Sequence, residues 1–183
     1  LPALPSGDWA AAERALAGRK ETAVIGPAEE ARPLIAALGL KGPVTLDRDE
    51  PHFELALDRL EIPDGPGVLR PLEDADRDTM IAWRTAYSQE ALGMDPDTAA
   101  SDGLRAYEGF LEAGSHRVLM EGERPLATTG FNATLPQIVQ VGGVYTPPEL
   151  RGRGHAGRAV ALHLAEARDR GVARATLFSA SET

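Results

Sequence analysis

Cysteine is absent from this 183-residue sequence, and lysine occurs only at Lys20 and Lys41. Without cysteine the chain has no disulfide framework, no thiol nucleophile and no thiolate metal ligand. It also lacks an apolar run near ~18 residues and a basic segment followed by an apolar one, so the sequence indicates neither a transmembrane helix nor a signal peptide. We therefore expect a cytoplasmic protein with no membrane partner, and the sequence indicates no metal site.

Acidic residues outnumber basic ones by 28 to 19, which gives a net charge of −9. Binding to a nucleic-acid backbone needs clustered positive charge, so this balance argues against a nucleic-acid partner. An acidic surface attracts cationic substrates such as amines, but it is also common among proteins with no such substrate. Apolar residues make up 43% of the chain and charged residues 26%, a composition typical of a folded globular protein.

A stretch of proline, glycine and aspartate at 63–67 is the clearest linker in the sequence. It divides the chain into residues 1–66 and residues 67–183. The first part is expected to be a small α/β region, and a degenerate half-domain is one interpretation of it. Its periodicity predicts helices at 8–18 and 27–38 and strands at 22–25, 44–46 and 53–60.

In the second part, the spacing of apolar residues predicts a strand, two helices, three strands, a long helix and a final strand. Asp74 is expected to cap the first helix, and Leu104, Tyr107, Phe110 and Leu111 are expected to face inward from the second. The remaining ranges are 68–72 for the first strand, 98–113 for the second helix, 117–120, 126–131 and 138–145 for the three strands, 154–170 for the long helix and 173–178 for the last strand.

One stretch suits a bound pyrophosphate. A strand that ends near Tyr145 is followed by a turn with two prolines and then by RGRGHA at residues 151–156, where the long helix starts. Glycine lets a ligand approach the backbone closely. The first turn of a helix has unpaired N–H groups and a partial positive charge, and two arginines add guanidinium groups there. The stretch therefore predicts an anion site.

The same residues resemble the signature of the GNAT superfamily of N-acetyltransferases: Gln or Arg, two residues, Gly, one residue, then Gly or Ala. Arg151, Gly154 and Ala156 meet this pattern, and the order of elements over 67–183 also resembles that family. The resemblance implies an α/β (α+β) fold with a mixed, mostly antiparallel sheet flanked by helices. Residues 140–156 look especially like a bacterial subgroup with a smaller N-terminal α/β region.

The resemblance implies an acyl-CoA-dependent N-acetyltransferase in which an amine attacks the thioester of acetyl-CoA, the co-substrate, directly. It also implies that the pantetheine arm pairs with the backbone of strand 138–145 and that strand 173–178 lies parallel to that strand. The Gly142-Gly143 pair predicts a bulge that opens the sheet between strands 138–145 and 173–178. The expected cofactor-binding residues are Val144, Thr146, Arg151, Gly152, Arg153, Gly154, His155 and Ala156.

Catalytic residues do not follow from the sequence. Glu90, Glu108 and Glu112 lie on or near the helices that usually border the acceptor pocket, and nothing in the sequence chooses among them. The acceptor, whether a small amine, an amino acid or a peptide N-terminus, stays open, and so does a homodimeric state. Relatives of this kind usually continue beyond the last strand, so we expect the chain to continue past Thr183.

Two alternatives compete with the transferase interpretation. The glycines at 152, 154 and 157 also fit the dinucleotide pattern G-x-G-x-x-G, but a turn with two prolines separates them from the strand, and no acidic residue ends the next strand. The other alternative is a non-catalytic module, on a degenerate fold of the same kind, that binds acyl-CoA or a protein partner.

Several other side chains have simpler interpretations. His155 is expected to be solvated, and His163 lies about two turns further along the helix, too far for a shared metal. Tyr145 fits the core and the acceptor pocket equally well. Trp83 is assigned to the core, and Asn132 and Gln140 to exposed strand edges.

Overall fold

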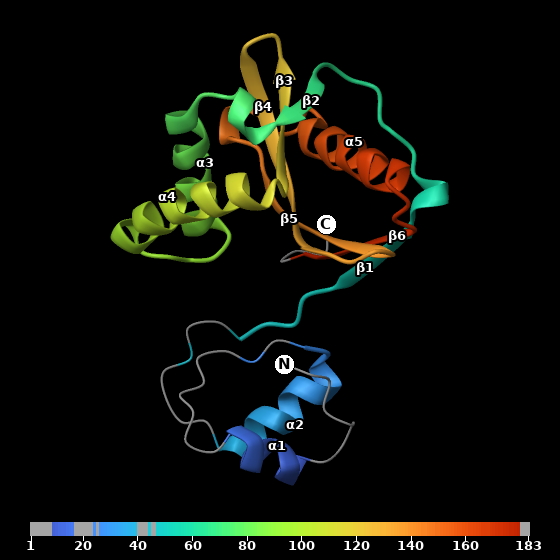
Figure 1. Cartoon of the computed structure of the whole chain (residues 1–183). Coiled ribbons are helices and arrows are strands. Elements are labelled where there is room, and N and C mark those ends of the chain that lie inside the picture. Colours follow the sequence, from blue (N-terminus) through green and yellow to red (C-terminus); the bar gives the residue numbers. More distant parts are fainter. Residues whose placement is uncertain (1–8, 17–23, 25, 40–43, 45–46, 180–183) are drawn as a thin grey trace. The chain divides into compact units, whose positions relative to one another are not determined.

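We describe a computed structural model of the 183-residue chain. The structure describes residues 9–16, 24, 26–39, 44 and 47–179 (Figure 1). These residues fall into two compact units, Leu1–Asp49 and Glu50–Thr183, and each unit is described by itself. None of the helices in the described ranges is both long enough and apolar enough to cross a membrane.

The smaller unit contains two helices, α1 (Trp9–Leu16) and α2 (Ala28–Leu38), which pack against each other. As predicted, Gly39 ends α2; its left-handed φ of 56° suits glycine. The strands expected at 22–25 and 44–46 lie outside the described residues, except for residues 24 and 44. A degenerate half-domain therefore stays a hypothesis for this region.

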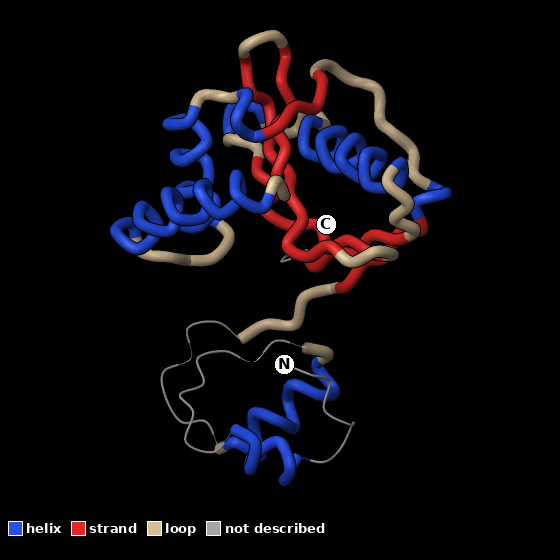
Figure 2. The backbone as a smooth tube through the Cα atoms, in the orientation of Figure 1, coloured by secondary structure: helices blue, strands red, loops and turns tan. Residues whose placement is uncertain are grey.

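The larger unit is built on a six-stranded sheet with the order β1-β6-β5-β4-β3-β2 (Figures 1 and 2). All neighbouring strands are antiparallel except β5 and β6, which are parallel. The predicted mixed, mostly antiparallel sheet is therefore confirmed. The strands are β1 (His52–Ala56), β2 (Val68–Pro71), β3 (His116–Glu121), β4 (Arg124–Thr134), β5 (Ile138–Tyr145) and β6 (Arg174–Phe178).

Helices cover both faces of this sheet. Helices α3 (Arg77–Glu90) and α4 (Pro96–Ala113) pack together on one face, and α5 (His155–Asp169) packs on the other (Figure 1). We call these the α3/α4 face and the α5 face. Helix α5 follows β5 and leads into β6, so it forms the crossover between the two parallel strands.

Side chains of successive strand residues point to opposite faces and so join different cores. In β3, Val118 belongs to a cluster with residues of α3 and α4, whereas Leu119 packs with Ala159 of α5. On the α5 face, Val160 and Leu164 pack with buried residues of β5 and β6, as the helical stripe predicted. The alternation decides which side chains reach each face.

Two details of the helices differ from the sequence prediction. Asp76, not Asp74, caps α3: its carboxylate accepts a hydrogen bond from the Thr79 N–H at 2.8 Å, because a short 3-10 turn at 72–74 delays the helix. Leu104 and Leu111 are 41% and 37% exposed rather than inward-facing. Helix α4 instead turns Gly103 toward α3, where an added Cβ would meet the Thr85 hydroxyl and the Ile81 carbonyl.

The boundary between the units lies between Asp49 and Glu50, not at the 63–67 linker. The strand expected at 53–60 is shorter, and β1 pairs with β6 instead of with N-terminal elements. Leu57, directly after β1, is fully buried in the core that contains Val139 and Leu164, which ties this segment to the larger unit. The edge of β6 that faces away from β5 is therefore covered by β1.

Candidate functional site

The parallel strands β5 and β6 are paired along only part of their length. Pairing runs from Ile138 with Arg174 to Gln140 with Thr176, and β5 then continues to Tyr145 paired only with β4. Within the described residues, the edge of β5 that faces away from β4 thus lacks a strand partner beyond residue 140. A strand edge of this kind presents N–H and C=O groups to an extended ligand.

A bulge lies in the part of β5 that pairs with β4 but not with β6. The β4–β5 pairing passes from Thr128–Tyr145 to Gly130–Gly142, so β5 carries one more residue than β4 over this stretch. Gly143 has a φ of 61°, a left-handed conformation that glycine adopts without a steric penalty. The bulge expected from the glycine pair is therefore present, next to the place where β5 and β6 separate.

The RGRGHA stretch forms the turn that leads into α5. Gly152 and Gly154 have left-handed φ values of 74° and 79°, and a Cβ at either position would meet no atom of the described residues within 4 Å. Arg158 is the first residue after this turn whose backbone N–H donates to a carbonyl of the described residues. Its acceptor is the Gly154 oxygen, at 3.0 Å. The N–H groups of 152–157 have no such partner there, and this arrangement suits an approaching anion.

The two arginines of the turn lie differently. Arg151 donates from Nε to the carbonyl of Thr146 at 2.9 Å and from Nη2 to the carboxylate of Glu90 at 2.5 Å. Its guanidinium also lies 5.7 Å from the centre of the Tyr145 ring. Arg153 is exposed. The cofactor role of both residues stays a prediction, and the side chain of Arg151 already has an anionic partner.

The expected solvated position for His155 is wrong. Its side chain is buried, with 7% of the residue exposed, because it shares the inward face of α5 with Ala159 and His163 at one-turn spacing. His163 stacks on Phe131 with ring centroids 3.8 Å apart. In the described part of the chain, no group of three or more acidic or histidine side chains is arranged to hold a metal.

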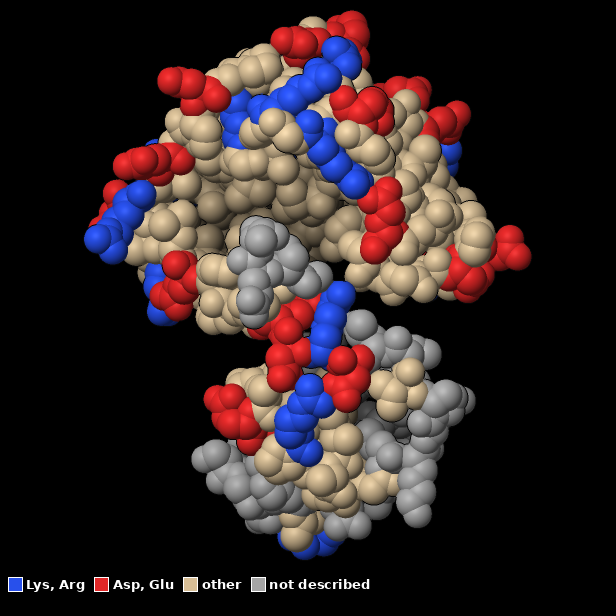
Figure 3. Space-filling view, turned by 180° about the vertical axis from the view of Figure 1, so that it is seen from behind, with Lys and Arg blue, Asp and Glu red and all other residues tan. Residues whose placement is uncertain are grey.

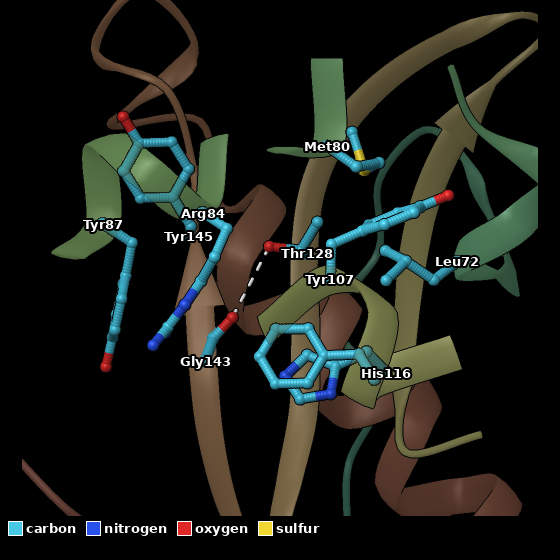
Figure 4. Close-up of a pocket in the computed structure, with 10 residues that line it drawn as sticks. Leu72, Met80, Arg84, Tyr87, Tyr107, His116, Thr128, Gly143 and Tyr145 are labelled. Atoms are coloured by element: carbon cyan, nitrogen blue, oxygen red, sulfur yellow. Dashed lines mark hydrogen bonds between the residues drawn. The ribbon is translucent and has the colours of Figure 1, made fainter. Parts of the chain in front are cut away.

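A small cavity of about 20 Å³ lies on the α3/α4 face and reaches the bulge at Gly143 (Figure 4). That volume is enough for roughly one water molecule. Most of its walls are apolar or aromatic, and Arg84 is its one charged lining residue. The lining residues are Leu72, Met80, Arg84, Tyr87, Tyr107, Phe110, His116, Thr128, Gly143 and Tyr145.

Tyr145 connects this cavity to the glycine-rich turn. It is buried, its hydroxyl donates to Glu90 at 3.2 Å, and the same carboxylate binds Arg151. Burial and the neighbouring Glu90 carboxylate raise the pKa of Tyr145, so its phenol stays protonated. The hydrogen bond from Arg151 lowers the pKa of Glu90, which is therefore ionised at neutral pH. Glu108 and Glu112 are exposed on α4, so Glu90 is the candidate base that contacts the cavity wall.

An apolar hollow of about 240 Å³ lies on the α5 face, between α5 and strands β1, β5 and β6. Val141, Val160 and Leu177 are among its lining residues, and Gly157 in the first turn of α5 borders it. Seen from behind, the larger unit is hollowed at its centre, with mostly uncharged walls and charged side chains around the rim (Figure 3). The cavity on the α3/α4 face and the apolar hollow on the α5 face therefore lie on opposite sides of the sheet, near the place where β5 and β6 separate.

Sequence reasoning did not single out Arg84 or His116 as site residues. Neither lies in a recognisable motif, and they reach the cavity from α3 and β3. Trp83, assigned to the core, is half-buried, packs against the core on the α3/α4 face and lies 6.1 Å from the Tyr145 ring. Asn132 is exposed, as expected, but the exposed edge expected for Gln140 is wrong, because this residue is half-buried and pairs with both β4 and β6.

No protein-family model and no curated protein matches this sequence. Among solved structures, a GCN5-related N-acetyltransferase from Kribbella flavida has a TM-score of 0.53 at 17% identity, over 83% of this chain and 56% of its own. A GCN5-related N-acetyltransferase from Ralstonia eutropha has a TM-score of 0.45 at 24% identity, over 73% and 85%. A protein from Clostridium acetobutylicum, described as a predicted acetyltransferase with acetyl-CoA, has a TM-score of 0.44 at 16% identity, over 73% and 82%.

The similarity to the Kribbella structure establishes the fold. This chain has the fold of the GNAT acetyltransferases, and the resemblance read from residues 67–183 is confirmed at that level. The chain spans just over half the length of that structure.

Proposed function

We propose that this chain, with its GNAT fold, is an acyl-CoA-dependent N-acyltransferase that transfers an acetyl group from acetyl-CoA to a primary amine. One observation carries the proposal: the β5–β6 split lies next to a turn whose backbone N–H groups are unpaired within the described residues. The split suits an extended pantetheine arm along Val144 and Thr146, and the turn suits the pyrophosphate on residues 152–156.

The proposed reaction needs little covalent chemistry from the protein. The amine nitrogen attacks the thioester carbon, a C–N bond forms, the C–S bond breaks, and the leaving thiolate takes up the second proton that the nitrogen loses as the amide forms. An alkyl amine with a pKa near ~10 must first lose a proton. Glu90 is the proposed acceptor of that proton, through Tyr145 or water, because it is ionised and contacts the cavity wall.

Arg153 is the proposed charge partner of the pyrophosphate, because its exposed side chain stands beside the turn while Arg151 is held by Glu90. A charge-assisted hydrogen bond contributes roughly 1.5–3 kcal/mol. Arg153→Ala is therefore expected to weaken CoA binding about ten- to a hundredfold, measured by calorimetric titration. Arg168→Ala, at the other end of the same helix, removes the same charge and is expected to leave the affinity unchanged. Equal losses in both variants would show a general charge effect and no local contact.

A thiol-release assay with acetyl-CoA and a panel of amines tests the reaction itself. Turnover of at least one amine is expected, with the released thiol matched by acetylated product. Normal CoA binding without turnover of any amine would instead favour the alternative, a non-catalytic acyl-CoA-binding module. Absence of CoA binding would remove both.

A further inference from the structure

Two nitrogen atoms in the wall of the α3/α4 cavity are buried and have no hydrogen-bond partner among the described residues: Arg84 Nε and His116 Nε2. Buried polar atoms are nearly always hydrogen-bonded, so each of these needs a physical explanation. Figure 4 shows that the Arg84 side chain extends between Tyr87 and the backbone of Gly143, with His116 on the other side of Gly143. Both side chains therefore stand around the bulge.

The positive charge of Arg84 is only partly neutralised at this cavity. Its Nη2 pairs with Asp102 at 2.9 Å, but the other oxygen of that carboxylate binds Arg105 at 2.8 Å. One carboxylate thus faces two guanidinium groups. Arg84 also lies 5.0 Å from the centre of the Tyr87 ring and 5.5 Å from that of Phe110. The cavity therefore combines aromatic walls with a cation that is only partly neutralised.

His116 adds an uncharged nitrogen. Burial, and then the charge of Arg84, lower the pKa of His116 to about 3, so its ring is neutral at physiological pH. The Ser115 hydroxyl lies 2.9 Å from Nδ1 and can donate to it, which leaves the ring hydrogen on Nε2. The ring fits against glycines: a Cβ at Gly130 or Gly143 would lie 2.2 or 2.5 Å from Nε2. The absence of side chains there keeps the ring in place.

We propose that this cavity is a carboxylate subsite, and that the amine acceptor is an amino-acid-like molecule whose carboxylate binds Arg84 and His116. The unpaired side-chain atoms of the cavity wall are both nitrogens able to donate, and a carboxylate oxygen has two lone pairs that can accept from them. A simple ammonium would be repelled by the positive charge of Arg84. The cavity has room for roughly one water molecule, so a single carboxylate oxygen would enter it, and an apolar or aromatic side chain of the ligand would lie against Tyr87 and Tyr145 at its edge.

This inference rests on the proposed function for its reaction, but its binding step can be tested without CoA. The probes are N-acetyl-L-phenylalanine and its amide, which differ only in the carboxylate, titrated into the whole chain by calorimetry. The unmodified protein is expected to bind the acid at least about tenfold more tightly than the amide, the size of one charge-assisted contact. Equal affinities for the two probes would overturn the proposal.

Variants separate a local contact from a general charge effect. Arg84→Gln is expected to abolish the preference for the acid. Arg77→Gln removes the same charge from the exposed start of α3, where Arg77 pairs with Asp78 and not with Asp102, does not line the cavity and is expected to keep the preference. Loss of the preference in both variants would overturn the proposal. If Arg84→Gln fails to fold, Arg84→Lys retains the charge beside Asp102 but lacks the Nε donor, so an unchanged preference in that variant would count against the subsite.

Turnover distinguishes the source of the carboxylate. With acetyl-CoA, phenylalanine is expected to react faster than phenethylamine, which lacks the carboxylate, and Arg84→Lys should narrow the difference. If phenethylamine reacts best with succinyl-CoA and depends on Arg84, the subsite stands, but the carboxylate belongs to the acyl donor. A preference for the acid probe without any turnover supports the subsite and rejects the proposed function. Turnover of simple amines without a preference for the acid probe supports the proposed function and rejects the subsite.

Discussion

Replacing Gly154 with valine is expected to weaken CoA binding by about a hundredfold or more, because a side chain would enter the space where the pyrophosphate must approach. Gly154 precedes α5 with φ 79° and ψ 3°, and a Cβ there would meet nothing within 4 Å in the part of the chain that the structure describes. Blocking two charge-assisted contacts of roughly 1.5–3 kcal/mol each is enough for this loss. Calorimetric titration of CoA measures it.

Gly171→Val is the matched control. Gly171, after the other end of α5, also has a left-handed φ, 95°, and a Cβ there would likewise meet none of the described atoms within 4 Å. A non-glycine residue in this conformation costs about 1–3 kcal/mol, so both variants should melt earlier. Only Gly154→Val should lose CoA. A folded Gly154→Val variant with unchanged CoA affinity would remove the cofactor site and, with it, the transferase proposal.

Asp102→Ala is expected to have the largest effect on stability, a loss of about 3–5 kcal/mol in the free energy of unfolding. The buried carboxylate accepts hydrogen bonds from Arg84, Arg105 and Ser88. The side chain of Arg84 is only 18% exposed, so removal of Asp102 leaves a largely desolvated cation without its carboxylate partner. Urea denaturation measures the change. Glu108→Ala, an exposed acid on the same helix, should stay within about 0.5 kcal/mol of the unmodified protein.

The effect of Asp102 should depend on pH in one direction. Burial opposes ionisation of this carboxyl, but hydrogen bonds from Arg105 and Ser88 and the charge of Arg84 outweigh it, so the pKa of Asp102 is lowered. A lowered pKa gives stability that is fully present above the unfolded value near ~4 and is lost as pH falls through the folded value. The stability difference between the unmodified protein and Asp102→Ala should therefore shrink on acidification. A difference that grows instead would contradict this account.

The sequence by itself determined the features that depend on neighbours along the chain. The helical stripe of α5 and the strand at 138–145 follow from the spacing of apolar residues. The left-handed conformations at Gly143, Gly152 and Gly154 follow from glycines placed where the chain must bulge or turn. The proposed pyrophosphate site therefore lies within a single stretch and could be predicted, although its ligand contacts stay a prediction.

The tertiary structure alone decided which distant residues meet. β1 pairs with β6 although nearly the whole larger unit separates them in sequence, and for that reason the boundary predicted at the linker was placed too late. Tyr145 reaches Glu90 across 55 positions, and Arg84 and His116 share a cavity although they lie on a helix and a strand. Burial of His155 depends on which face of α5 meets the sheet. Contacts of this kind arise from packing between elements, and the local pattern of side chains does not specify which distant residues will pack together.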